Sequence, residues 1–461
     1  MTNFPFGFNP GSSDEGDENS GASNPGTPGG TPIDPFAALM GGSPGDLGAA
    51  FSRLGELMSY QGGPVNWDLA RDVARQTVSA AGDRSIATAE REQILDAMRL
   101  AELWLDAACA FPASSTTVKA WSRAEWVEAT LPAWRELVDP LAGRVVDSMG
   151  AMLGGAGGLG GIGGAGGPDN PLAQLGAMPE QAAALAGPMQ QMMRSIGGAM
   201  FGTQIGQAIG ALAAEVVGST DVGLRLAPAG TAALLPANIT AFGAGLDTPA
   251  DQVRLYLALR EGAHQRLYAH APWLQAHLVE AVAAYARGIS VDTEKLQEAL
   301  GSINPSDPEA VQQAMSGGLF EPEDTPEQRA ALSRLETLLA LVEGWVDEVV
   351  DAAATGTLPA AQALRETVCR RRASGGPAEA TFASLVGLEL RPRRLREAAE
   401  VWRGVLAERG QDGREALWGH PDLLPSADDL EHPGAFALGS SAPLDLSGLD
   451  DTEAPPEPDL P

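Results

Sequence analysis

Four glycines recur at every fourth position in one stretch of the chain, and they constrain the fold more than any other feature. Gly198, Gly202, Gly206 and Gly210 lie in a segment that otherwise has helical character. Residues four apart share one face of an α-helix, so these glycines expose a stripe of backbone. A second helix can approach such a stripe closely. The sequence therefore predicts a helix packed tightly against another helix.

This segment is also apolar enough to suggest a membrane span. However, Gln204, Gln207 and Glu215 lie within about 20 residues, the length of one span, and they make insertion into lipid costly. The segment is therefore interpreted as a buried helix of a soluble protein.

Apolar residues at helical spacing fill most of the remaining chain, whereas Gly223 to Phe242, with Pro228 and Pro236, favours short strands or loops. The predicted fold class is mainly α, with at most a few short strands around residues 223–242. The predicted helices cover residues 66–81, 85–111, 122–137, 141–152, 179–193, 248–268, 273–287, 293–300, 325–354, 358–372, 378–388 and 392–409.

Composition divides the chain into five parts. Residues 1–35 and 434–461 are acidic and rich in Gly, Ser or Pro, so we expect two disordered tails. A helical bundle is expected at 36–153, a Gly-rich linker at 154–170, and a second helical domain at 171–433. The glycine tract lacks a following Lys-Ser/Thr pair and is no phosphate-binding loop.

The charge of the chain limits its partners and its location. A formal net charge of -30 opposes binding to nucleic acid or to an anionic membrane surface. The basic stretch 365–409 is interpreted as a set of partners for the acidic remainder.

Cys109 and Cys369 are the only cysteines, and no secretory signal is visible, which favours the cytoplasm.

One short motif carries recognisable chemistry, Arg260-Glu261-Gly262-Ala263-His264. In a His-Glu-x-x-His helix, two imidazoles at i and i+4 face one zinc ion, and the glutamate activates the attacking water. Here the spacing is retained, but arginine replaces the first histidine and cannot coordinate a metal.

The sequence around this motif, PANITAFGAGLDTPADQVRLYLALREGAHQRLYAHAPWLQAHL, resembles the zincin-like type 2 metallopeptidases, a family also labelled as hydrolases. Further similar blocks are GPVNWDLARDVARQ, LLALVEGWVDEVVDAA, GGPAEATFASLVGLELRPRRLREAAEVWR and ALWGHPDLLPSADDLEHP, and together they span most of residues 60–433. Some branches of this family carry Arg-Glu-x-x-His as their ordinary pattern.

The resemblance implies a multi-helix zincin-like fold that holds zinc on His-Glu-x-x-His, with a distant acid as the third protein ligand. Carried over to this chain, Glu261 matches the general base, His264 matches the second histidine, and Glu343 is the candidate distant acid. We expect the Arg260 guanidinium to take the charge role of zinc by pairing with Glu343 or Glu261.

Three readings of function follow. The first is a zincin relative that has no protease activity and acts by binding an unknown peptide or protein. It is expected to hold no cofactor, and any metal that it did hold would be zinc. The second is an active zinc-dependent hydrolase with a metal site rebuilt from His264, Glu343 and either His270 or His277. The third is a non-enzymatic scaffold that recruits partners through its acidic tails.

Overall fold

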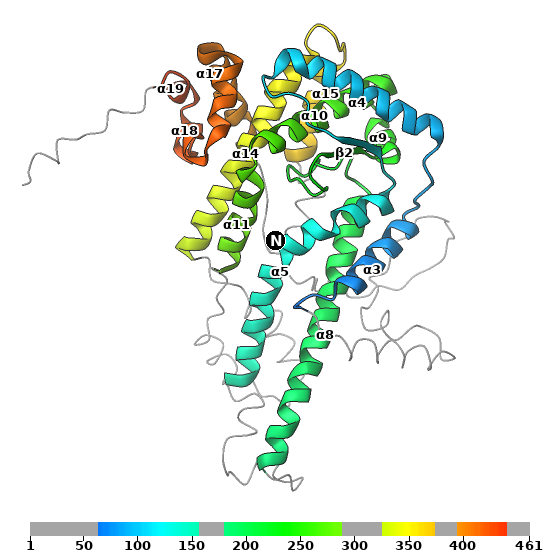
Figure 1. Ribbon diagram of the computed structural model, residues 1–461, viewed down its shortest axis with the longest axis vertical. Coiled ribbons are helices and arrows are strands. Elements are labelled where there is room, and N and C mark those ends of the chain that lie inside the picture. Colours follow the sequence, from blue (N-terminus) through cyan, green and yellow to red (C-terminus); the bar gives the residue numbers. More distant parts are fainter. Residues whose placement is uncertain (1–62, 156–178, 288–324, 374–393, 440–461) are drawn as a thin grey trace, which may run out of the picture.

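The computed structural model describes residues 63–155, 179–287, 325–373 and 394–439, and helices dominate them (Figure 1). The α-helices are α3 Trp67–Ala80, α4 Thr88–Ala108, α5 Arg123–Gly155, α8 Pro179–Ala213, α9 Pro236–Gly243, α10 Ala250–His270, α11 Trp273–Arg287, α14 Pro326–Ala354, α15 Ala361–Ala373, α17 Leu395–Ala416, α18 Ala427–Glu431 and α19 Pro433–Ala437. The remaining elements are strands β1 Thr117–Ala120 and β2 Thr231–Leu234 and the 3-10 turns η1 Leu417–Gly419 and η2 Pro421–Leu423.

Helix boundaries follow the local signals in several places. Asn66 caps α3, and its side-chain oxygen accepts a hydrogen bond from the Leu69 amide at 3.1 Å. Thr325 forms a capping box with Gln328 at the start of α14. Helix α11 begins and ends at the predicted residues. These agreements confirm the mainly helical fold class.

Two predicted helices at 122–137 and 141–152 are in fact one helix, α5, which contains Pro132 and Pro140. A proline inside a helix removes one backbone hydrogen bond and crowds the preceding turn. Leu137, Val138 and Leu141 are buried around Pro140. Packing on both sides of the proline therefore offsets the local cost and keeps the helix continuous.

The strand prediction is correct for β2 but omits its partner. Strand β1 pairs with β2 in parallel, with Thr117 opposite Thr231, and it lies outside the predicted β region. A strand of four residues, of which only Ala120 is buried, carries too little periodicity to be recognised. The end of the predicted β region is instead helix α9, with Pro236 at its first position.

The glycine stripe of α8 lies against another helix, as predicted; that helix is α3, and the two run side by side (Figure 1). A Cβ atom on Gly202 would stand 2.5 Å from the Asn66 carbonyl oxygen, and one on Gly206 would stand 2.4 Å from the Ala70 carbonyl oxygen. Such distances leave no room for any side chain. The glycines therefore set the separation of the two helices.

The hydrophobic core includes side chains from both sides of the glycine tract, and every residue of α10 from Leu255 to Tyr268 is buried. Helices α4 and α14 and strand β2 all pack against α10. The division into two domains stays a prediction, since the residues between α5 and α8 are not described. No helix in the described ranges is long and apolar enough to cross a bilayer.

Several predictions concern residues outside the described ranges. They are the disordered tail at 1–35, the helices at 293–300 and 378–388, and most of the linker 154–170 and of the tail 434–461. The first residues of the predicted C-terminal tail are not a tail, because they belong to helix α19, and Ala437 is buried in the core.

Candidate functional site

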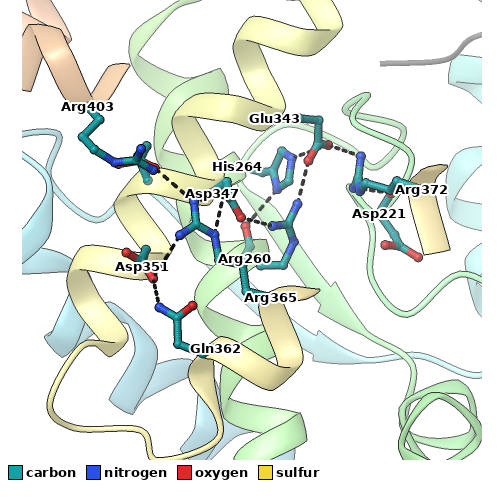
Figure 2. A network of polar contacts seen from close by, with 11 residues as sticks. Asp221, Arg260, His264, Glu343, Asp347, Asp351, Gln362, Arg365, Arg372 and Arg403 are labelled. Atoms are coloured by element: carbon teal, nitrogen blue, oxygen red, sulfur yellow. Dashed lines mark hydrogen bonds and ion pairs between the residues drawn. The ribbon is translucent and has the colours of Figure 1, made fainter. Parts of the chain in front are cut away.

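The motif of α10 faces α14 through a buried ion pair. Arg260 and His264 lie one turn apart on α10, and both reach the Glu343 carboxylate on α14 (Figure 2). The Arg260 Nη2 atom lies 2.6 Å from Glu343 Oε2, and the His264 Nε2 atom lies 3.1 Å from Glu343 Oε1. The structure thus places Arg260 against Glu343, the first of the two partners expected from the sequence.

A second arginine completes the surroundings of Glu343. Arg372, in the last turn of α15, places its Nη1 atom 2.7 Å from Glu343 Oε1. Sequence reasoning missed this contact, because it treated Arg372 only as one member of a basic run. Both carboxylate oxygens of Glu343 are therefore occupied, and the side chain of Glu343 is only 1% exposed.

Charge in this cluster stabilises the ionised forms. Burial would raise the pKa of Glu343, but the positive charge of Arg372 and of the α10 side chains outweighs burial and keeps that pKa below its usual range. Burial would likewise lower the pKa of Arg260, but Glu343 together with Tyr256, Asp347 and Asp221 outweighs burial and raises that pKa. The carboxylate and the guanidinium are both charged at neutral pH.

The two ring nitrogens of His264 both face acceptors. Its Nδ1 atom lies 2.9 Å from the Arg260 carbonyl oxygen, and its Nε2 atom faces the Glu343 carboxylate. A ring that donates from both nitrogens satisfies both partners. Both ring nitrogens of His264 are therefore engaged with oxygen atoms of the protein.

Glu261, the expected general base, has a different environment. Its carboxylate accepts hydrogen bonds from the Thr220 hydroxyl at 2.7 Å, the Thr220 amide at 3.1 Å and the Gln265 amide group at 3.0 Å, and it also accepts one from the Ser219 hydroxyl. A Cβ atom on Gly218 would lie 2.7 Å from Glu261 Oε2. Through these hydrogen bonds the Glu261 carboxylate holds Ser219 and Thr220, which precede β2, against α10.

Several arginines of the basic stretch pair with acidic side chains, as expected, and Figure 2 shows Arg365, Arg372 and Arg403 among them. Arg365 lies 2.5 Å from Asp347 and 3.1 Å from Glu348. The further pairs are Arg365 with Asp351, Arg370 with Glu366, Arg371 with Asp221, Arg372 with Glu343, Arg394 with Glu431, and Arg403 with Glu348.

His270 and His277 belong to an aromatic cluster rather than to this site. The ring of His270 stacks on Phe111 at 4.9 Å, and its Nδ1 atom lies 2.8 Å from the Arg266 carbonyl oxygen. The ring of His277 meets Trp273 edge-on at 5.3 Å. Within the described residues, no group of three or more His, Cys, Asp or Glu side chains has an arrangement that could hold a metal ion.

The side chains at the motif do not fit a zinc ion. A protein zinc site needs three or four donor atoms with free lone pairs. Here His264 and Glu343 are the two donors that the family resemblance assigns, and both take part in internal hydrogen bonds. The third position is the permanently charged Arg260.

Comparisons with known proteins relate this arrangement to one family. The sequence model described as zincin-like metallopeptidase matches residues 65–437. Among solved structures, the chain is similar to a "putative hydrolase with a novel fold" from Chloroflexus aurantiacus, with a TM-score of 0.52 and 21% identity over 82% of this chain and 99% of that one. At this identity the likeness shows the fold alone. The comparison with curated proteins gave no match.

Proposed function

The chain belongs to the zincin-like metallopeptidase family, and we propose that it acts without a metal, by binding a peptide or protein partner. The observation that carries this proposal is the buried contact of Arg260 with Glu343 at 2.6 Å. A guanidinium is a permanent cation that binds a carboxylate but not a metal. The arginine therefore replaces the metal as the positive charge that joins α10 to α14.

The environment of Glu261 supports the same proposal. A general base must reach the proton that it removes, directly or through one water molecule. The two oxygens of Glu261 instead accept hydrogen bonds from Ser219, Thr220 and Gln265, and the side chain is buried. Hydrolysis would require these contacts to break, whereas a structural role uses them as they are.

A surface hollow offers a place where a partner could bind. It has a volume of about 470 Å³ and is lined by Arg75, Lys119, Trp121, Ala124, Glu125, Glu128, Ala129, Pro228 and Thr231. Arg75 pairs with Glu128 at 2.9 Å. Lys119, on the exposed part of β1, takes part in no ion pair within the described residues. This free ammonium group favours a partner that presents a carboxylate.

We expect the unmodified protein to contain much less than one zinc ion per chain after dialysis against a zinc solution, because Arg260 and Arg372 both contact Glu343, the candidate carboxylate ligand. Elemental analysis measures this, and a mixed-peptide digest followed by mass spectrometry tests for cleavage. The control is Glu261→Gln, which should match the wild type in both assays. Stoichiometric zinc together with cleavage that Glu261→Gln abolishes would overturn the metal-free proposal.

Binding itself is tested with a random-peptide display library. Selection on the wild type should enrich peptides that contain Asp or Glu, and Lys119→Glu should bind them about tenfold more weakly, since a rim charge is reversed without any change in the core. Arg396→Glu, which reverses an exposed positive charge on α17, is the matched control and should bind like the wild type. Failure to enrich any peptide, or equal binding to Lys119→Glu, would count against this hollow.

A further inference from the structure

We infer that Arg372 is a second barrier to metal binding, so that changing Arg260 alone does not recreate a zinc site. The inference rests on the proposed absence of metal from the wild-type site, but it concerns a different residue and a different helix. His264 Nε2 and Arg372 Nη1 share one oxygen of Glu343, at 3.1 and 2.7 Å. A metal ion held by His264 and Glu343 would have to lie beside that oxygen, next to the Arg372 guanidinium.

Arg372 is fixed in this position by the segment before β2. Its Nη2 atom donates to the Asp221 carbonyl oxygen at 2.9 Å. The neighbouring Arg371 donates to the Glu215 carbonyl oxygen at 2.6 Å and lies 3.1 Å from the Asp221 carboxylate. The last turn of α15 is therefore fastened to residues 215–221, and Arg372 cannot move away without breaking several hydrogen bonds.

The backbone closes over the same carboxylate oxygen. Gly223 has a φ of +77°, and a Cβ atom there would lie 2.9 Å from Glu343 Oε1. The Tyr268 hydroxyl donates to the Gly223 carbonyl oxygen at 2.6 Å, which ties this turn to α10. Glu343 and His264 are each about 1% exposed. Arg372 thus occupies the space beside Glu343 that an incoming ion would need.

The positive charge of Arg372 determines how strongly this residue should weaken zinc binding. When Arg260 is changed to histidine, Arg372 still neutralises Glu343 and still repels any cation beside it. Two like charges a few ångströms apart in a partly buried site interact strongly enough to change an affinity by at least about tenfold. Zinc binding should therefore depend on whether position 372 carries a positive charge.

Three variants test this, with zinc affinity measured by competition with a coloured chelator. Arg260→His combined with Arg372→Ala should bind one zinc ion at least about tenfold more tightly than Arg260→His alone. Arg260→His combined with Arg372→Lys is the matched control, because it shortens the side chain but keeps the charge, and it should bind as weakly as Arg260→His alone. Equal affinity of all three variants, or no zinc binding by the alanine double variant, would overturn the inference.

A variant that fails to fold without metal is still informative. Metal binding and folding are coupled, so zinc should then restore the helical circular dichroism signal of the alanine double variant but not that of the lysine double variant. Absence of any recovery would contradict the inference. Zinc binding by the wild type would contradict the proposed function. The order of zinc affinities among the three variants tests only the role of Arg372, so failure of the proposed function and failure of this inference can be told apart.

Discussion

Glu343→Gln is expected to lower the free energy of unfolding by about 3–5 kcal/mol, the cost of breaking a buried ion pair from one side. The carboxylate of Glu343 faces Arg260 and Arg372 as well as the ring of His264. Glutamine has a similar shape, so the loss would come from uncompensated buried positive charge rather than from a cavity. Urea denaturation at about pH 7 measures the difference.

Glu348→Gln is the matched control on the same helix. Burial raises the pKa of Glu348 despite the nearby Arg403 and Arg365, so its ionised form gains little from the fold. Arg403 is about half exposed and can return to water. We expect a loss below about 1 kcal/mol. Equal losses of unfolding free energy for the two substitutions would show that the Glu343 ion pairs contribute no more to stability than those of Glu348.

The pH dependence of this loss has a definite sign. The pKa of Glu343 is lowered in the folded state, so its contribution is fully present above the ordinary value of 4.5 and is lost as the pH falls from there toward the folded pKa. The difference in unfolding free energy between wild type and Glu343→Gln should therefore narrow below about pH 4.5. Acid effects of other carboxylates cancel in this difference. A difference that stays constant down to about pH 3 would contradict the assignment.

Local signals in the sequence predict the helices but not how they meet. Asn66 and Thr325 cap their helices as their side-chain chemistry requires, and the glycine spacing in α8 predicts its close packing. Strand β1 escapes prediction because its pairing with residues more than 100 positions away decides its conformation, not its own four residues. The sequence predicts two helices where α5 is continuous, because tertiary packing around Pro140 overrides the tendency of proline to interrupt a helix.

The candidate site shows the same limit. The i, i+4 spacing places Arg260 and His264 on one face, and the family resemblance points to Glu343, so these three side chains could be anticipated. Arg372 could not, because nothing in the periodicity of α15 indicates which helix its last turn meets. Nor could the hydroxyl groups that hold Glu261, since Ser219 and Thr220 lie in an irregular segment.

The second large effect is expected in the α3–α8 contact. Gly206→Ala would place a Cβ atom 2.4 Å from the Ala70 carbonyl oxygen and 2.8 Å from the Val73 Cβ atom. Neither atom is the end of a flexible side chain, so the two helices would have to separate. We expect a loss of about 1–3 kcal/mol of unfolding free energy, the usual cost of overpacking a core.

Gly197→Ala on the same helix separates this steric effect from helix propensity. Among the described residues, a Cβ atom on Gly197 would meet nothing within 4 Å. Alanine is favoured over glycine inside a helix by up to about 1 kcal/mol, so Gly197→Ala should leave stability unchanged or raise it. Propensity acts in the same direction at Gly206, so a loss there must come from contact with α3. If both substitutions stabilise the protein equally, the glycine stripe does not set the distance between the helices.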